Sequence, residues 1–347
     1  MPPEIDFDIE SVFKHYPDMT MSKIQAAMLK HNGRVNLSKM INIEKSEFQY
    51  FKMTMLSINH KKYPLKKLML NDCELTDGKF SALVPLICKF KWVILNGTQK
   101  IGISGWTAFR EYLTKHGCKI EKLELKISKT EASAIQLRRK MEDLAEDLEE
   151  IATDQDGWEI NDNDMEELAP ALARIKEVHL GQNAITEKGW ATLKNAIKKQ
   201  ETLRTMYGTP NKLAILNLSL TSQQNVKGEI KYIQPSHMRE LSNVLIQMEE
   251  VNLAGQQLIG GKAPKKESNL EKSTEKLETG WQIFERIVEE TDSGNLRLKS
   301  LDVMNCNLDT NVIDGLKKAL SQKVKFIFDQ KSQNYEGQTT SCCVCCK

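Results

Sequence analysis

Apolar residues recur along the middle of the chain in a short repeated frame. In the clearer copies, an apolar residue is followed three and five positions later by two more, and an Asn, Cys or Gln stands eight positions after the first. The copies begin at Leu65, Phe90, Ile120, Ile175, Met248 and Leu298, those at Phe90 and Ile120 being looser. The second and third apolar positions flank a single intervening residue, as in a strand with one buried face. The frame predicts a row of short strands.

A Gly-Trp pair stands three times before a helical pattern. The pairs and the apolar residues that follow them are Gly105-Trp106 with Phe109 and Leu113, Gly189-Trp190 with Leu193 and Ile197, and Gly280-Trp281 with Phe284 and Val288. Residues at these offsets share one face of a helix. Each pair therefore predicts a helix that begins beside it, and strands and helices alternate.

The alternation resembles a leucine-rich repeat, whose signature is L-x-x-L-x-L-x-x-N/C. One strand and one full helix per repeat is similar to the ribonuclease-inhibitor-like subfamily, which also forms the sensor ends of NLR proteins. The resemblance covers about residues 60–328. It implies an α/β leucine-rich repeat solenoid over residues 49–328, with parallel strands inside and helices outside.

Two segments interrupt this array. Residues 130–153 carry apolar residues at alternating steps of four and three, which predicts a long helix, packed on the solenoid rather than paired in a coiled coil. Residues 260–279 are rich in Gly, Lys, Glu and Ser, which predicts a flexible insertion.

Residues 1–48 lack the frame and predict a small three-helix module, with helices over Ile9 to His15, Thr20 to His31 and Val35 to Ile43. Pro17 ends the first helix and Asn32-Gly33 ends the second. Such a module is either a separate domain or a cap on the first repeat, because solenoids need atypical ends.

The segments Val12 to Met19, Ile24 to Met28 and His31 to Val35 resemble a CUE domain, a relative of UBA domains that commonly binds ubiquitin. The resemblance implies a ubiquitin-binding adaptor acting through residues 6–45. The contact positions that it implies are His15, Tyr16, Pro17, Asn42 and Ile43. His15 and Asn42 depart from the family's pattern.

Composition narrows the function classes. The chain has 49 Lys+Arg and 47 Asp+Glu among 347 residues, a net charge of +2, which argues against nucleic acid as a partner. It has neither a membrane-spanning apolar run nor a secretory h-region, and its eight cysteines lack the spacing of a disulfide framework. We expect a cytoplasmic protein.

Motifs of catalysis are missing from the sequence, so we expect no enzyme and no cofactor. It has no His-Glu-x-x-His and no Gly-x-Ser-x-Gly motif. Residues Gly255 to Lys262 superficially resemble a phosphate-binding loop, which leaves a nucleotide-binding switch as a remote alternative. There an extra glycine breaks the spacing and Ala263 replaces the hydroxyl that would meet magnesium.

The outward residues of the predicted strands offer a surface for a protein partner, and we expect the chain to act as an interaction scaffold. In the clearer copies these concave-face residues are Met69, Asn71, Glu124, Lys126, His179, Gly181, Asn252, Ala254, Asp302 and Met304. Their mixed charge favours a protein over a polyanion.

Residues 329–347 predict a disordered, cysteine-rich tail. Cys342, Cys343, Cys345 and Cys346 fall within its last six residues, and the C-a-a-X position for prenylation is Val344. Palmitoylation of two or more of these cysteines is the favoured interpretation, because stable anchoring takes two signals. It would tether the chain peripherally to the cytoplasmic face of a membrane. Unmodified thiols and a soft-metal site are the alternatives; adjacent cysteines are poorly placed to close a tetrahedral site alone.

Overall fold

The computed structural model divides into two compact units. Residues 1–218 and 222–231 form the N-terminal unit, and residues 219–221 and 232–347 form the C-terminal unit. The residues described are 32–38, 52–53, 55–56, 64–71, 73, 75–96, 101–117, 119–125, 160–181, 183–207, 212–219, 233–256, 259, 278–291, 295–306, 308–320 and 324–328. Each unit is described by itself.

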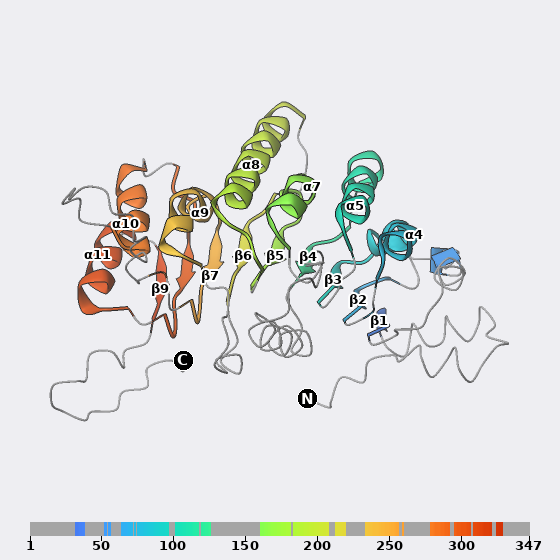
Figure 1. Ribbon diagram of the computed structural model, residues 1–347, viewed down its shortest axis with the longest axis horizontal. Coiled ribbons are helices and arrows are strands. Elements are labelled where there is room, and N and C mark those ends of the chain that lie inside the picture. Colours follow the sequence, from blue (N-terminus) through green and yellow to red (C-terminus); the bar gives the residue numbers. More distant parts are fainter. Residues whose placement is uncertain are drawn as a thin grey trace, which may run out of the picture. The chain divides into compact units, whose positions relative to one another are not determined.

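The N-terminal unit contains six parallel strands in chain order. They are β1 (Arg34–Asn36), β2 (Lys67–Met69), β3 (Trp92–Ile94), β4 (Lys122–Glu124), β5 (Glu177–His179) and β6 (Ile215–Asn217). Successive strands pair without stagger, so that their central residues form one row: Val35, Leu68, Val93, Leu123, Val178 and Leu216. The helices α4 (Asp77–Ile87), α5 (Ile103–His116), α7 (Asp162–Leu172) and α8 (Glu187–Tyr207) lie on one side of these strands (Figure 1).

The C-terminal unit repeats this arrangement. Its strands β7 (Glu250–Asn252), β8 (Ser300–Asp302) and β9 (Lys325–Ile327) are also parallel and unstaggered. A 3-10 turn, η2 (Pro235–His237), leads into α9 (Met238–Leu245), and α10 (Gly280–Glu290) and α11 (Thr310–Leu320) follow. The α/β fold class with parallel strands is thus confirmed within each unit.

The core lies between strands and helices and is built from the three apolar positions of the frame. The first position is buried in every strand from β2 to β8, as at Phe90 and Ile175, both 0% exposed. The second and third positions are buried as well, because alternate side chains of a strand point to the same face. Burial of these columns supplies the main driving force for folding, at roughly 25 cal/mol per Å² of apolar surface.

Polar side chains tie the ends of three strands, β2, β5 and β8, to the strand before each. Asn183 donates from Nδ2 to the backbone oxygen of Leu125, at 2.8 Å, and its Oδ1 accepts from the N–H of Ile160, at 3.0 Å. The thiols of Cys73 and Cys306 donate in the same way to Leu37 and Leu253. The eighth position of the frame therefore satisfies backbone groups that the short strands leave unpaired.

The Gly-Trp pairs stand where successive helices approach each other. As predicted, α5, α8 and α10 begin at the glycine of each pair or two residues before it. A Cβ on Gly105 would lie 2.8 Å from Oδ1 of Asp77 at the start of α4, so a side chain would not fit without displacement. Trp106 is 2% exposed and packs edge-on against Phe80, with ring centroids 5.1 Å apart.

Two strands depart from the sequence analysis. Residues 34–36 form β1, so the third predicted helix, Val35 to Ile43, is wrong at its start, and the sheet begins inside the range assigned to the three-helix module. Asn32 stands at the first, normally apolar, position, which hid this copy of the frame. β6 was not predicted, although Leu213, Leu216 and Leu218 follow the apolar positions of the frame. Its eighth residue is Thr221, and the looser copy at Phe90 also has a threonine there, Thr98.

Several predictions concern residues outside the described ranges: the first two N-terminal helices, the long helix over 130–153, most of the 260–279 insertion and the cysteine-rich tail. They stay predictions. Among the described helices, none combines the length and the apolar character needed to cross a bilayer.

Candidate functional site

The strands of the N-terminal unit present a second face, opposite the helices. Because side chains alternate along a strand, the residues on either side of each buried central residue point away from the core. We call the eight such residues of β2 to β5 the strand face: Lys67, Met69, Trp92, Ile94, Lys122, Glu124, Glu177 and His179. Unlike the apolar columns of the core, this row carries charged and aromatic groups.

Trp92 lies at the centre of the strand face, between two lysines. Nζ of Lys67 is 4.1 Å from the centroid of the Trp92 ring, and Nζ of Lys122 is 4.7 Å from it. These distances are those of cation–π interactions. The indole N–H donates to Oε1 of Glu124, at 3.0 Å, which fixes the ring in its plane.

Lys122 links the tryptophan to the partly buried pair Glu177 and His179. Its Nζ lies 2.7 Å from Oε1 of Glu177, and Nε2 of His179 lies 2.7 Å from the same oxygen. Burial by itself would raise the pKa of Glu177, but hydrogen bonds from Lys122 and His179 and the charges of both groups outweigh it and leave the pKa below its ordinary value. Glu177 is therefore ionised at neutral pH.

Some of the residues predicted to contact a partner belong to this face or lie beside it. Met69, Glu124 and His179 lie on it, and Asn71 and Gly181 lie in the turns directly after β2 and β5. His179 is only 8% exposed, so it supports Glu177 more than it offers a contact. Lys126 is outside the described residues.

The predicted contact residues of the C-terminal unit have a structural role of their own. Oδ1 of Asn252 accepts from the N–H of Ala254, at 2.9 Å, and Oδ1 of Asp302 accepts from the N–H of Met304, at 3.0 Å. These bonds shape the turns that end β7 and β8. Met304 is 38% exposed and is the most accessible of the four.

Besides Ile94, four residues of the strand face were missed: Lys67, Trp92, Lys122 and Glu177. Each stands directly before the central apolar residue of its strand. The residue two positions later is on the same face, and in β2, β4 and β5 that residue was predicted. Because positions two apart share a face, the same alternation could have found them. Trp92 was the hardest of them to recognise, because tryptophan is a residue type expected in the core and not on an outer face.

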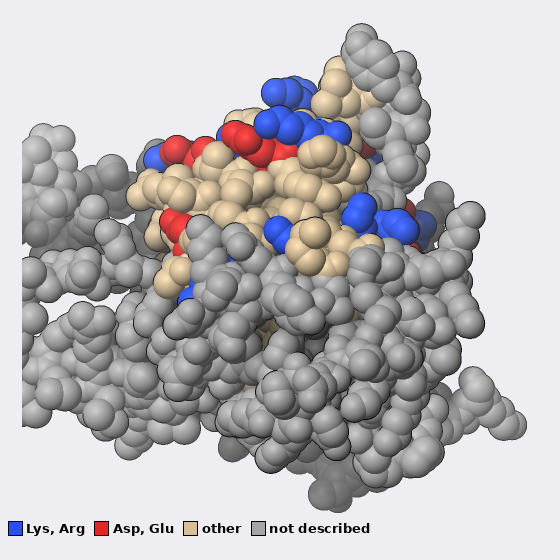
Figure 2. Space-filling model, turned by 90° about the vertical axis from the view of Figure 1, so that its right-hand side faces the viewer, with Lys and Arg blue, Asp and Glu red and all other residues tan. Residues whose placement is uncertain are grey.

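Charges on the described surface are mixed. Figure 2 shows Lys and Arg side chains and Asp and Glu side chains in small separate groups, with larger areas of other residues between them. The described residues on this one face form no continuous basic stripe of the kind that phosphate backbones require.

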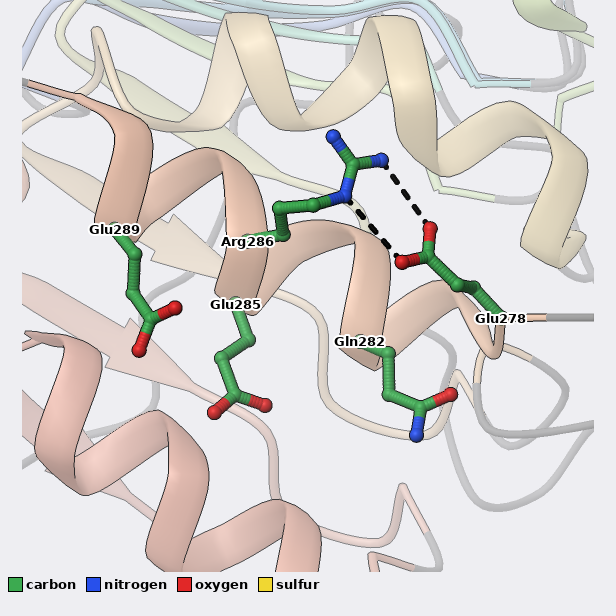
Figure 3. Close-up of a pocket in the computed structure, with 5 residues that line it drawn as sticks. All are labelled: Glu278, Gln282, Glu285, Arg286 and Glu289. Atoms are coloured by element: carbon green, nitrogen blue, oxygen red, sulfur yellow. Dashed lines mark hydrogen bonds and ion pairs between the residues drawn. The ribbon is translucent and has the colours of Figure 1, made fainter. Parts of the chain in front are cut away.

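A shallow depression of about 470 Å³ lies beside α10, lined by Glu278, Gln282, Glu285, Arg286 and Glu289. Arg286 points toward Glu278 and away from the other acids (Figure 3), with Nη2 and Oε2 3.2 Å apart. The hydrogen bond and charge of Glu278 raise the pKa of Arg286. An exposed ion pair of this kind contributes little, and the depression has no buried polar group to orient a ligand.

The phosphate-loop and metal hypotheses gain no support from the described residues. Gly255 lies in the turn after β7, where its N–H donates to the backbone oxygen of Met304, at 2.8 Å, and Lys262 lies outside the described ranges. Among the residues that the structure describes, no group of His, Cys, Asp or Glu side chains could hold a metal ion. The implied ubiquitin contacts, His15 to Pro17 with Asn42 and Ile43, also lie outside them.

No protein-family model matches the chain, and no significant match to a curated protein was found.

Proposed function

We propose that this protein is a non-enzymatic interaction scaffold that binds a protein partner through the strand face of its N-terminal unit. The observation that carries the proposal is the row Lys67–Trp92–Lys122, in which an aromatic ring and two cations stand on the side of the sheet opposite the described helices. Trp and positively charged side chains with apolar stems are frequent anchors of protein interfaces.

We further propose that the scaffold is a leucine-rich repeat protein of the ribonuclease-inhibitor-like kind. Supporting this are the unstaggered parallel strands, the full helix that follows most of them, and the bonds from Asn183, Cys73 and Cys306 back to the preceding strand. In that architecture the surface of the strands is the usual place for a large partner.

The side chains around Trp92 are already held in place before a partner binds, which favours a high affinity. Glu124 orients Trp92, and Glu177 neutralises much of the charge of Lys122, so that few rotamers must be ordered when a partner arrives. Lys67, in contrast, has contact with the Trp92 ring and can meet a carboxylate of the partner.

The experiment compares partners captured by the full chain in cells after crosslinking. We expect Trp92→Ala and Lys67→Gln to lose the partner that the wild-type chain captures. Tyr112→Ala and Lys188→Gln are the matched controls, because Tyr112 stacks on His116 within α5 and Lys188 pairs with Glu166 between α7 and α8, all on the helix side. Retention of every partner by the folded Trp92→Ala chain would refute the proposal.

A second part of the proposal concerns location. The four tail cysteines favour palmitoylation, which would hold the scaffold at the cytoplasmic face of a membrane.

A further inference from the structure

Cations gather where the strands of the N-terminal unit begin. The segments that lead into β2, β3, β4 and β5 are residues 64–66, 88–91, 117–121 and 173–176. In the segments before β3 and β5, a buried apolar residue has a cation on either side. We call the six cations of the four segments the basic edge: Lys66, Lys89, Lys91, Lys119, Arg174 and Lys176.

Backbone hydrogen bonds set these segments side by side. The N–H of Trp92 donates to the backbone oxygen of Lys66, at 2.9 Å. The N–H of Glu121 donates to the oxygen of Lys91, at 2.7 Å, and the N–H of Glu177 to that of Glu121, at 2.9 Å. Successive segments therefore follow one another at about the strand spacing of 4.8 Å. The cations lie at the surface, because each segment is anchored to the core by one buried residue: Leu65, Phe90, Ile120 or Ile175.

Nearby acids do not cancel the charge of the basic edge. Within the described residues of the four segments the only acid is Glu121, which pairs with Lys91 at 2.7 Å. The acids nearest in sequence on α5, α7, β4 and β5 pair with cations outside the edge: Glu111 with Lys115, Glu166 with Lys188, Glu167 with Arg110, and Glu124 and Glu177 with Lys122. Four members of the edge pair with no carboxylate of the described residues: Lys89, Lys119, Arg174 and Lys176.

Nucleic acid and lipid suit this edge less well than an acidic polypeptide does. α4, α5 and α7 end at the edge, and the C-terminal end of a helix carries about half a negative charge, which weakens the field that dense phosphate backbones need. The net charge of +2 adds no long-range attraction for a polyanion. Phe90, the aromatic residue of these segments, is 0% exposed, so the edge offers no ring to stack on a base or to enter a headgroup layer.

The residue types of the edge match carboxylates on a flexible segment. Five of the six cations are lysines, and a lysine ammonium is a point charge on a flexible stem, which pairs with a carboxylate without a fixed geometry. We infer that the basic edge binds an acidic segment of a partner polypeptide. The edge shares no residue with the strand face, so the inference goes beyond the proposed function, and either can fail without the other.

The test measures binding of a labelled polyglutamate peptide to the full chain by fluorescence anisotropy, at about 0.05 M and about 0.2 M salt. We expect saturable binding that weakens at the higher salt, because salt screens exposed charges. Lys89→Gln, Lys119→Gln and Lys176→Gln together should raise the Kd roughly tenfold, as the loss of three exposed ion pairs predicts. Changing the same three residues to Arg keeps the charge and should keep the affinity.

The matched control removes three charges from the C-terminal unit: Lys317, Lys318 and Lys325, all exposed, are changed to Gln. This control should bind the peptide like the wild type, and so should Trp92→Ala, which affects the strand face alone. Absence of saturable binding, or equal weakening by the two Gln triple variants, would overturn the inference. Tighter binding of a single-stranded oligonucleotide or of phosphatidylserine vesicles, lost in the edge variant, would also overturn it and assign the edge to nucleic acid or to a membrane.

Discussion

Asp162 and Gly189 are in direct contact although they belong to successive helices, α7 and α8. Oδ1 of Asp162 accepts hydrogen bonds from the N–H of Gly189, at 3.0 Å, and from the N–H of Thr186, at 2.8 Å. Asp77 accepts from the N–H of Gly102, at 2.6 Å, in the same way. A carboxylate at the start of one helix thus fixes the start of the next, and the glycine lets the two approach.

Gly189→Ala should destabilise the protein. The new Cβ would lie 2.5 Å from Oδ1 of Asp162 and 2.7 Å from Cγ2 of Ile185, so the starts of α7 and α8 must move apart. We expect the free energy of unfolding, measured by urea denaturation, to fall by about 1–3 kcal/mol, despite the better helix propensity of Ala. Gly102→Ala is the control, because its Cβ would have ordinary contacts of 3.5 Å or more, and it should change stability by less than about 0.5 kcal/mol. Equal stability of the two variants would contradict the conclusion that Gly189 is needed for the close approach of α7 and α8.

Asn183→Ala should lower the free energy of unfolding by more than the loss of so small a side chain suggests. The substitution leaves the backbone oxygens of Leu125 and Leu180 and the N–H of Ile160 without the side chain that bonds them. We expect a loss of about 2–4 kcal/mol in the free energy of unfolding, because unpaired buried polar groups are expensive. Asn195→Ala, on the exposed surface of α8, should be nearly neutral. A loss at Asn183 no larger than at Asn195 would mean that the side chain does not link the strands.

Glu177 should make stability depend on pH in the acid range. Its folded pKa lies below the ordinary value of 4.5, so the unfolded chain binds more protons in that interval, and the stabilisation is present above pH 4.5 and lost as the pH falls through the folded pKa. The difference in unfolding free energy between wild type and Glu177→Gln should therefore be larger at about pH 7 than at about pH 3. In a Lys122→Gln background the difference should depend less on pH. The same difference at both values in the wild-type background would argue against the ionised pair.

Replacement of the four tail cysteines with serine should move the protein from the membrane fraction to the soluble fraction of cells. Two acyl chains anchor a protein where one does not, so double replacements should keep the membrane distribution and triple replacements should lose it. Hydroxylamine, which cleaves thioesters, should release acyl groups from the wild-type chain only. An unaltered distribution together with no released acyl group would mean that the anchor does not exist.

Ubiquitin binding is best tested on the full chain. A fragment of residues 1–48 would separate β1 from β2, with which it pairs. If the module binds ubiquitin, labelled ubiquitin should show amide shifts when the chain is added, and these should weaken with Tyr16→Ala. Absence of shifts would assign residues before β1 to capping alone.

The alternation of apolar residues predicted six strands of the sheet and the helices beside the Gly-Trp pairs, because burial sets both patterns directly. The copy at β1 was missed because the polar Asn32 interrupts the apolar frame, and the copy at β6 was missed although its apolar residues Leu213, Leu216 and Leu218 are all in place. Strand pairing compensates for such interruptions, but pairing is not visible in one sequence. The stack of Lys67 and Lys122 on Trp92 was missed for the same reason, since its members are brought together only by the register of β2, β3 and β4.

The unstaggered register also places equivalent residues of the strand face at a regular spacing. Lys67, Trp92, Lys122 and Glu177 are equivalent in four adjacent strands, so they follow one another at the strand spacing of about 4.8 Å. An extended peptide crossing them returns to the same side only every two residues, or about 6.6 Å, and falls out of step. A helix rises about 5.4 Å per turn and keeps pace over three or four strands. If a partner binds the strand face as proposed, this spacing would favour a helical segment that presents about one turn to each strand.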